Sequence, residues 1–589
     1  MSGDETRKDN RFEGAGVSPG IARGKVYIVR EESEEVVRYR IASSQIGDEI
    51  SRFETALIQT RMQILEMQQR IAESIGAKDA AIFDAHLLVV EDRTLIDEVL
   101  RKLETDLCNV ESIFQEVATR YAETLNKIDD PYLRERALDI QDVTKRVIRN
   151  LQGKAPKTFL SLTEPHILIA HNLTPSDTAT VNRSNVLGIA TDVGSRTSHT
   201  AILARSLSIP AIVGLHDITA KLETGQEVLL DGNDGCLIVN PSPETLACYT
   251  DIESRRAKVV AKLKELRETT STTRDGRHIV LSANIELPED VDAVQANGAE
   301  GIGLYRTEFL YLNRSSLPSE DEQYETYLRV AERVRPHPLI IRTFDLGGDK
   351  LALGIVDATD ELNPFLGWRA IRFCLENMEI FKTQLRAILR ASTAGNVKIM
   401  FPMISGLDEL RRAIAALEEC KQDLRRSKVP MAEKLEVGAM IEIPSAAICA
   451  NVLAPEVDFF SIGTNDLIQY ALAVDRVNEK IAYLYEPTHP AILRLLKMVA
   501  DAAHASGIWV GVCGEMAGDV ALVPLLLGLG MDELSTAAIM VPRIKRAVQS
   551  LAIPECRELV EKTFKLNTAW EILAQCLELA DKRYGDLLG

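Results

Sequence analysis

The apolar positions between residues 43 and 152 recur with the spacing of helices. One stripe consists of residues seven apart with two more between them: Ile46, Ile50, Phe53, Leu57, Ile64 and Ile71. Such a stripe is typical of the packing face of a long, coiled-coil-like helix. Further amphipathic segments follow in the same region, so the pattern predicts an all-helical module of several helices.

Beyond Pro165, short apolar strands separated by turn residues replace the helical pattern. The predicted strands cover residues 166–170, 186–191, 209–213, 227–231 and 236–239. A helix follows His199 among them, which indicates a compact α/β domain. Residues 14–30 contain turns and a short strand with no partner nearby. We expect them to join this domain, so that the helical module is an insertion in it.

A charged helical pattern over residues 243–268 predicts a linker, and the run Thr269–Thr273 predicts a flexible end to it. Beyond Arg274, strands and helices alternate. The predicted strands are residues 279–285, 301–305, 339–343, 397–402, 437–443, 459–463, 509–513 and 533–536. Eight such units favour a C-terminal (β/α)8 TIM-type barrel. An open doubly wound sheet is the alternative, but the chain has no GxGxxG motif after a strand and no GxxxxGK[ST] motif.

Composition narrows the classes of function. The 589 residues carry a net charge of −19, so nothing favours binding to nucleic acid or to an anionic membrane. The acidity suits a basic protein partner or a solvated surface. No apolar run is long enough for a membrane span, and the polar start has no secretory core. Nine scattered cysteines without a CxxC pair indicate reduced thiols in the cytoplasm.

The run from Asp192 to Ala201 carries the first candidate chemistry. It places His199 in a Gly/Ser/Thr-rich turn directly before an apolar helical segment, which predicts a histidine at a helix N-terminus. Free backbone N–H groups and the helix dipole stabilise an anion there. A neutral imidazole at this position is a candidate nucleophile toward a phosphoryl group. The alternative is that His199 only caps the helix or packs against it.

In a barrel, functional side chains lie at the C-terminal ends of the strands. Residues of the expected kinds stand there in this chain: Arg306, Arg342, Glu442, Asn465, Asp466 and Cys513. Two arginines suit a phosphate and a carboxylate, and Glu442 and Asp466 offer oxygen ligands for Mg²⁺. Cys513 is the plausible proton carrier among them. Each has an ordinary alternative, a surface ion pair or a buried small apolar residue, but together they favour a small phospho-acid as ligand.

Several motifs closely resemble enzyme I of the bacterial phosphotransferase system, the phosphoenolpyruvate–protein phosphotransferases. The resemblance runs from residues 18–22 to the end of the barrel. Its most specific parts are residues 196–200, 305–310, 363–372, 463–470 and 513–519. Two departures are small, because Ser195 stands where a second glycine is expected and Met516 replaces a more usual leucine.

By motif position, the resemblance implies that His199 is the phosphorylated histidine and that Cys513 protonates the enolate. It assigns phosphoenolpyruvate binding to residues on the barrel: Arg306, Arg342, Arg369, Asn465, Asp466 and Arg476. It makes Glu442 and Asp466 the Mg²⁺ ligands. The implied reaction moves the phosphoryl group of phosphoenolpyruvate through His199 to the histidine phosphocarrier protein and releases pyruvate, as the first step of sugar uptake.

The resemblance also implies a division of labour along the chain. Residues 14–35 and 151–242 would form a swivelling phosphohistidine domain, and residues 36–150 an inserted helical domain that binds the carrier. Residues 243–273 would form the helical linker. Residues 274–589 would form the barrel that binds phosphoenolpyruvate and makes a homodimer.

Three other interpretations stay open at this point. A pyruvate–phosphate dikinase or phosphoenolpyruvate synthase shares these parts, but it needs a nucleotide-grasping domain, and the helical insertion is too short for one. A non-catalytic scaffold or a plain barrel lyase with a structural His199 would leave the rim residues or the β-rich domain without a role. Between the sugar and nitrogen-regulatory branches, the lack of an N-terminal sensory module favours the sugar branch.

Overall fold

The computed structural model describes most of the chain. The described residues are 10–29, 36–74, 82–127, 131–154, 164–174, 185–194, 198–207, 209–311, 316–346, 366–476, 478 and 480–588. They divide into two compact units, residues 1–254 and residues 255–589. Each unit has hydrophobic clusters of its own.

The first unit contains the helical module. Its helices are α1 (Ile46–Ser74), α3 (Ile82–Val90), α4 (Arg93–Asp106), α5 (Val110–Asn126) and α6 (Pro131–Leu151). The predicted stripe of α1 faces the core, because Phe53, Ile64 and Ile71 are buried against the other helices. The prediction of an all-helical module is confirmed.

The same unit contains an eight-stranded sheet. Its strands are β1 (Asn10–Glu13), β2 (Ala15–Ser18), β3 (Ile21–Val29), β4 (His166–Ala170), β5 (Val186–Thr191), β6 (Ala211–Val213), β7 (Glu227–Asp231) and β8 (Cys236–Val239). Their order is β1-β8-β7-β3-β4-β5-β6-β2. Strand β3 pairs with β4 in parallel and with β7 in antiparallel, so the N-terminal strands belong to this sheet as predicted. Strand β1 is an addition that the sequence pattern did not indicate.

Alternation along β4 divides the core between the two faces of the sheet. Ile167 and Ile169 belong to one apolar cluster, and Leu168 and Ala170 belong to the other. The second cluster includes Ala201 and Ala204 of α8 (His199–Ser206), while α9 (Ile218–Lys221) contributes to the first. Helix α8 is therefore anchored to the sheet by its small apolar side chains.

The predicted flexible end of the linker is wrong. Helix α10 (Pro243–Glu265) forms the linker, but the run after it is bonded to its surroundings. Ser271 is fully buried and accepts a hydrogen bond from the Ile279 N–H (2.9 Å), and Thr272 forms a β-bridge with His278. A run of five hydroxyl residues is typical of a mobile segment in composition. Here, however, Thr269 donates its hydroxyl to the Leu266 carbonyl (2.8 Å), and Thr273 donates its hydroxyl to the Arg277 carbonyl (3.2 Å).

The second unit is a closed barrel of eight parallel strands, as predicted. They are β9 (Val280–Ile285), β10 (Ile302–Tyr305), β11 (Leu339–Arg342), β12 (Val397–Phe401), β13 (Val437–Ile441), β14 (Phe459–Ile462), β15 (Trp509–Val512) and β16 (Glu533–Ala537). Each strand pairs with the next, and β16 closes the barrel by pairing with β9. The open-sheet alternative is therefore excluded.

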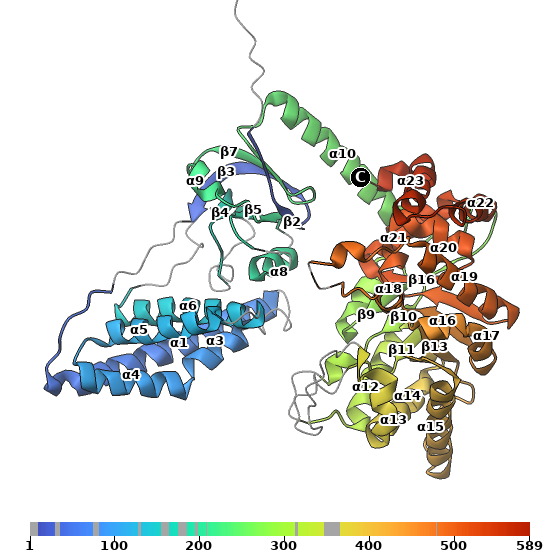
Figure 1. Ribbon diagram of the computed structural model, residues 1–589, viewed down its shortest axis with the longest axis horizontal. Coiled ribbons are helices and arrows are strands. Elements are labelled where there is room, and N and C mark those ends of the chain that lie inside the picture. The colour runs from blue at the N-terminus through green and yellow to red at the C-terminus, as the bar shows by residue number, and fades with distance from the viewer. Residues whose placement is uncertain are drawn as a thin grey trace, which may run out of the picture. The chain divides into compact units, whose positions relative to one another are not determined.

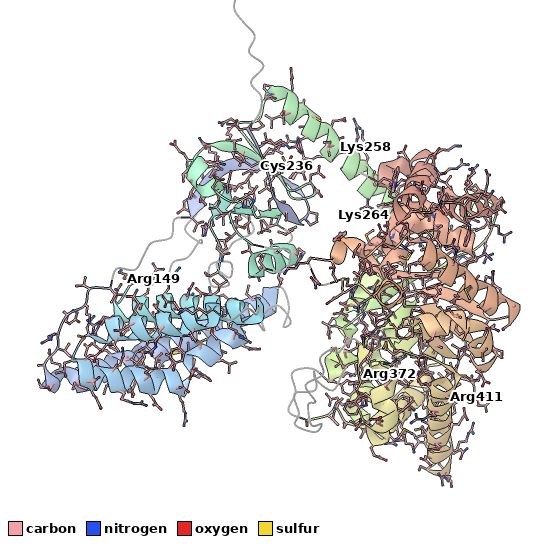
Figure 2. The ribbon with its side chains drawn as sticks, viewed as in Figure 1. Arg149, Cys236, Lys258, Lys264, Arg372 and Arg411 are labelled. Atoms are coloured by element: carbon pink, nitrogen blue, oxygen red, sulfur yellow. The ribbon has the colours of Figure 1, made fainter. Side chains whose placement is uncertain are left out.

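Helices surround these strands (Figure 1). They are α11 (Val291–Ala296), α12 (Glu320–Val334), α13 (Ala370–Glu376), α14 (Met378–Ala391), α15 (Leu407–Arg426), α16 (Pro444–Ile448), α17 (Ala450–Leu453), α18 (Thr464–Leu472), α19 (Pro490–Ala505), α20 (Val523–Leu529), α21 (Val541–Ser550), α22 (Ile553–Thr563) and α23 (Ala569–Tyr584). Within the described part of the chain, none of the helices has the length and apolar character that crossing a membrane requires. All nine cysteines are unpaired, and most are buried; Cys236 lies within the sheet of the first unit (Figure 2).

Candidate active site

His199 is the first residue of α8, which confirms its predicted place at a helix N-terminus. Ser198 is the N-cap, and its hydroxyl oxygen accepts a hydrogen bond from the Ala201 N–H (3.4 Å). Thr200 is buried and donates its hydroxyl to the Leu173 carbonyl (3.2 Å). The turn before the helix, residues 195–197, lies outside the described residues, as does the departure at Ser195. The backbone thus holds His199 where the helix dipole favours an anion.

Arg342, at the end of β11, is the central cation of the barrel mouth. Its Nη2 bonds Glu308 Oε1 (2.8 Å) and its Nη1 bonds Asp345 Oδ2 (2.6 Å). Only 11% of its side chain is exposed. Burial alone lowers the pKa of the guanidinium, but Asp345, Glu308 and Glu442 raise it further than burial lowers it. Arg342 is therefore a permanent positive charge in a largely dry place.

Arg369 joins this group from the residue before α13. Its Nη2 lies 2.8 Å from Asp345 Oδ1 and 3.7 Å from Asp466 Oδ2. Asp345 therefore bridges two arginines, using a different oxygen for each. The neighbouring carboxylates raise the pKa of Arg369 against the effect of burial.

Glu442 follows β13 and is buried beside these charges. Its Oε1 accepts the Met403 N–H (2.6 Å). Burial, followed by the charges of Asp466 and Asp345, raises the pKa of Glu442 well above its usual range. Gly463 is needed opposite it, because a Cβ there would stand 2.8 Å from Glu442 Oε2. Burial likewise raises the pKa of Glu308, although Arg342 opposes that shift.

The buried set has more carboxyl groups than guanidinium groups. Two guanidinium groups, Arg342 and Arg369, face four carboxyl groups: Glu308, Asp345, Glu442 and Asp466. A divalent cation would balance this excess, and carboxylate oxygens are the ligands that Mg²⁺ prefers. Among the described residues, no group of three or more His, Cys, Asp or Glu side chains is arranged to hold an ion. Glu442 and Asp466 would therefore need substrate and water oxygens to complete a coordination shell.

Cys513 follows β15 and is also buried. Its Sγ lies 3.7 Å from the Ile462 carbonyl oxygen. Burial raises the pKa of the thiol to about 11, while Ser461, Arg342 and Arg306 act in the opposite direction. The side chain is therefore a protonated thiol near neutral pH, the form that can give a proton.

The remaining predicted residues form an outer, more exposed set. Arg306 Nη1 pairs with Glu286 Oε1 (2.8 Å), and Arg476 Nη1 pairs with Glu515 Oε1 (2.8 Å). Asn465 bonds Glu515 twice: its Nδ2 donates to Oε1 (3.1 Å), and its Oδ1 accepts the backbone N–H (2.8 Å). The barrel thus brings Arg342, Arg369, Glu442 and Asp466 together, and it holds Arg476 and Asn465 on Glu515.

Three carboxylates at this mouth were missed in the analysis of the sequence: Glu308, Asp345 and Glu515. Each pairs with a predicted arginine. A local signal was present only for Asp345, which follows its partner Arg342 by three residues. Glu308 and Glu515 pair with arginines that are distant in the sequence. An arginine buried at a strand end requires a counter-charge, so a nearby acid was the place to look.

Backbone strain occurs beside the same residues, although not only there. Three non-glycine residues have positive φ angles there: Ala370 (53°), Met403 (56°) and Ala473 (53°). Ala370 follows Arg369, Met403 bonds Glu442, and Ala473 ends α18 shortly before Arg476. Each such residue costs on the order of 1 kcal/mol, a cost found chiefly at functional sites.

Three family models match the chain in order. They are "PEP-utilising enzyme, N-terminal" over residues 13–136, "PEP-utilising enzyme, mobile domain" over residues 162–235, and "PEP-utilising enzyme, PEP-binding domain" over residues 260–553.

Whole-chain relatives agree with these models. A phosphoenolpyruvate-protein phosphotransferase of Bacillus sp. (strain S) is 48% identical over 567 residues, which cover 96% of this chain and 98% of the relative. The protein of the same name from Geobacillus stearothermophilus is 47% identical over 567 residues, with the same coverage. That from Bacillus subtilis (strain 168) is 45% identical over 563 residues, covering 96% of this chain and 98% of the relative.

Proposed function

This chain belongs to the family of phosphoenolpyruvate–protein phosphotransferases, and we propose that His199 carries the phosphoryl group in its reaction. The chain is thus a phosphotransferase that uses phosphoenolpyruvate. In the proposed sequence of steps, the phosphoryl group passes from His199 to the histidine phosphocarrier protein, and pyruvate is released. This is the first step of the phosphotransferase system for sugar uptake.

One observation carries the assignment of the site. Arg342 and Arg369, bridged by Asp345, lie within a single charged cluster with Glu442 and Asp466. The thiol of Cys513 is within electrostatic reach of Arg342 and Glu442. These are the groups that a doubly anionic enol phosphate needs: cations for its oxygens and a proton source for its methylene carbon.

The arginines bind and orient the substrate. Arg342 and Arg306 offset the charge on the oxygens of the transferring phosphoryl group, and Arg369 orients it. Arg476 and Asn465 hold the remaining oxygens from the outer side. In each case the substrate must compete with a carboxylate that already pairs with the guanidinium.

The carboxylate excess of the buried set supports a resident divalent cation, and we assign it as Mg²⁺. Glu442 and Asp466 would hold it. When bound, the ion supplies positive charge to the substrate oxygens and relieves repulsion between these two carboxylates.

His199 is the nucleophile. Its neutral imidazole attacks phosphorus in line through Nε2, the phosphorus–oxygen bond to the enol breaks, and the electron pair stays with the enolate. The N-terminus of α8 then faces the transferred negative charge, which its backbone N–H groups stabilise. His199 and the barrel belong to different units. His199 must therefore move between the barrel, where it takes up the phosphoryl group, and the carrier protein, where it gives the group up.

Cys513 completes the reaction. Its thiol gives a proton to the methylene carbon of enolpyruvate, which becomes pyruvate, and the resulting thiolate recovers a proton from water. The raised pKa of about 11 keeps the thiol protonated for this step.

The partner surfaces are assigned from family membership. The inserted helical domain, residues 36–150, binds the carrier, and exposed apolar side chains on it support a docking surface: Ile58, Met62 and Leu88. The phosphohistidine domain comprises residues 14–35 and 151–242, residues 243–273 link it to the barrel, and residues 274–589 form the dimerising barrel.

The test is phosphoryl uptake by the His199→Ala variant. Incubated with phosphoenolpyruvate and Mg²⁺, the wild type should gain the mass of one phosphoryl group, and the variant should gain none. His166→Ala, on β4 of the same unit, is the matched control and should be labelled like the wild type. Labelling of the His199→Ala variant, or labelling of the wild type from ATP instead, would refute the assignment.

A further inference from the structure

Asp345 has a position unlike that of the other acids at the barrel mouth. Its Oδ2 accepts from Arg342 Nη1 (2.6 Å) and its Oδ1 from Arg369 Nη2 (2.8 Å), so one carboxylate sets the distance between two guanidinium groups. Only 2% of its side chain is exposed. No role was assigned to this residue from the sequence or from family membership.

The backbone around Asp345 is fixed on both sides. The Phe344 N–H donates to Gln384 Oε1 (2.8 Å), and Leu346 O accepts the Ala370 N–H (3.1 Å). The ring of Phe344 packs against Tyr311, with centroids 4.7 Å apart. The second of these bonds also ties the Asp345 segment to the start of α13, next to Arg369. Asp345 is therefore a rigid reference point for both arginines.

The bridge leaves one donor of Arg342 unused. On Arg342, Nη2 is held by Glu308 and Nη1 by Asp345, while Nε is buried and has no hydrogen-bond partner among the described residues. A buried N–H without a partner is costly, and an incoming anion would satisfy it. The guanidinium is thus oriented before substrate arrives.

Stability alone is a weak reason for this arrangement. A buried ion pair contributes little net stability, because desolvation offsets the attraction between its charges. Asp345 also places a negative charge beside the cations that bind an anionic substrate, which opposes substrate binding. A residue that opposes binding, yet fixes two binding groups, suits a role in which geometry at the transition state matters more than affinity.

We propose that Asp345 is a positioning residue, which holds Arg342 and Arg369 at the separation that the transferring phosphoryl group requires. This rests on the proposed function. It predicts an unusual signature for Asp345→Asn: the affinity for phosphoenolpyruvate stays the same or increases, because one opposing charge is gone. The rate of phosphoryl transfer falls about 100-fold, because the guanidinium groups are no longer held in place.

Two measurements separate these effects. Titration calorimetry of phosphoenolpyruvate with Mg²⁺ on the His199→Ala and His199→Ala/Asp345→Asn proteins gives affinity without chemistry. Rapid-quench single turnovers on the proteins with His199 intact give the rate of transfer. Asp345→Glu, which keeps the charge but adds a methylene, should bind like the wild type and transfer more slowly.

The control is Asp321→Asn. Asp321 lies on the outer helix α12 and is an exposed partner of Arg390 (2.7 Å), so this substitution should change neither the affinity nor the rate. A parallel loss of affinity and rate in Asp345→Asn, or full wild-type transfer in Asp345→Glu, would overturn the proposal. If Asp345→Asn does not fold, Asp345→Glu decides alone. Absence of labelling in the wild type would instead refute the proposed function.

Discussion

The two arginines deep in the barrel mouth differ from the two at its rim. Side-chain exposure is 11% for Arg342 and 13% for Arg369, against 39% for Arg306 and 41% for Arg476. All four pair with carboxylates at hydrogen-bonding distance. Water screens the outer ion pairs, so each contributes little interaction free energy. The inner ion pairs lie in surroundings of low dielectric constant, where the interaction between charges is strong. We therefore expect Arg342 to contribute more to the transition state than Arg306 does, and Arg476 to act mainly in the capture and release of substrate.

Removing an inner arginine should have the largest effect. Arg342→Ala removes the central cation of the mouth and leaves Glu308 without its partner, while Asp345 keeps Arg369. The lost transition-state stabilisation should be about 4 kcal/mol, which corresponds to about a 1,000-fold decrease in kcat/KM. Steady-state pyruvate release with the carrier protein measures it. The control is Arg411→Ala. Arg411 lies on the outer helix α15 (Figure 2), and the substitution breaks its exposed pair with Glu456 (2.7 Å). A decrease of tenfold or less would remove the distinction between inner and outer arginines.

Cys513→Ala should have the next largest effect and should separate two steps. Pyruvate formation should slow by about 100-fold or more, because the proton donor is lost, while phosphoenolpyruvate binding changes little. The measurement is a single-turnover experiment that traps enolpyruvate and quantifies it separately from pyruvate. An equal loss of pyruvate formation and of phosphoenolpyruvate binding would mean that Cys513 supports the fold of the mouth and gives no proton.

The same residue predicts the pH dependence. The folded-state pKa of the thiol is raised to about 11, so the thiol stays protonated below that pH. Between pH 7 and 9.5, the rate of enolpyruvate protonation should therefore stay constant in the wild type. A loss of rate with an apparent pKa near 8.5, the usual value for a cysteine, would contradict the buried environment of Cys513.

The smallest effect is expected at the rim. Arg476→Ala removes an exposed pair with Glu515, and kcat/KM should decrease about tenfold, mainly through KM. The phosphoenolpyruvate KM of the wild type should also rise with ionic strength, because salt weakens the attraction between exposed charges and largely removes it beyond about 10 Å at 0.1 M. In Arg476→Ala that salt dependence should be weaker. An equally steep dependence in both proteins would show that the outer arginine does not capture substrate.

Much of the fold could be predicted from the sequence, because its signals are local. The spacing of Ile64 and Ile71 required one buried helix face, and the residues before His199 marked a helix start. The barrel strands were predicted within a few residues. Predictions were wrong at positions 269–273, where composition indicated flexibility and buried backbone bonds prevailed, and strand β1 was missed because its side chains are mostly exposed.

The sequence by itself determined which residues of the barrel end each strand, since strand length and turn residues are short-range properties. Only the tertiary structure decided which acid pairs with which arginine. Closing the barrel brings Glu308, Arg342 and Glu442 together from three different strand ends, and burial there turns ordinary carboxylates into strongly perturbed ones. Desolvation and charge pairing depend on every neighbour in space, and no pattern along the chain records those neighbours.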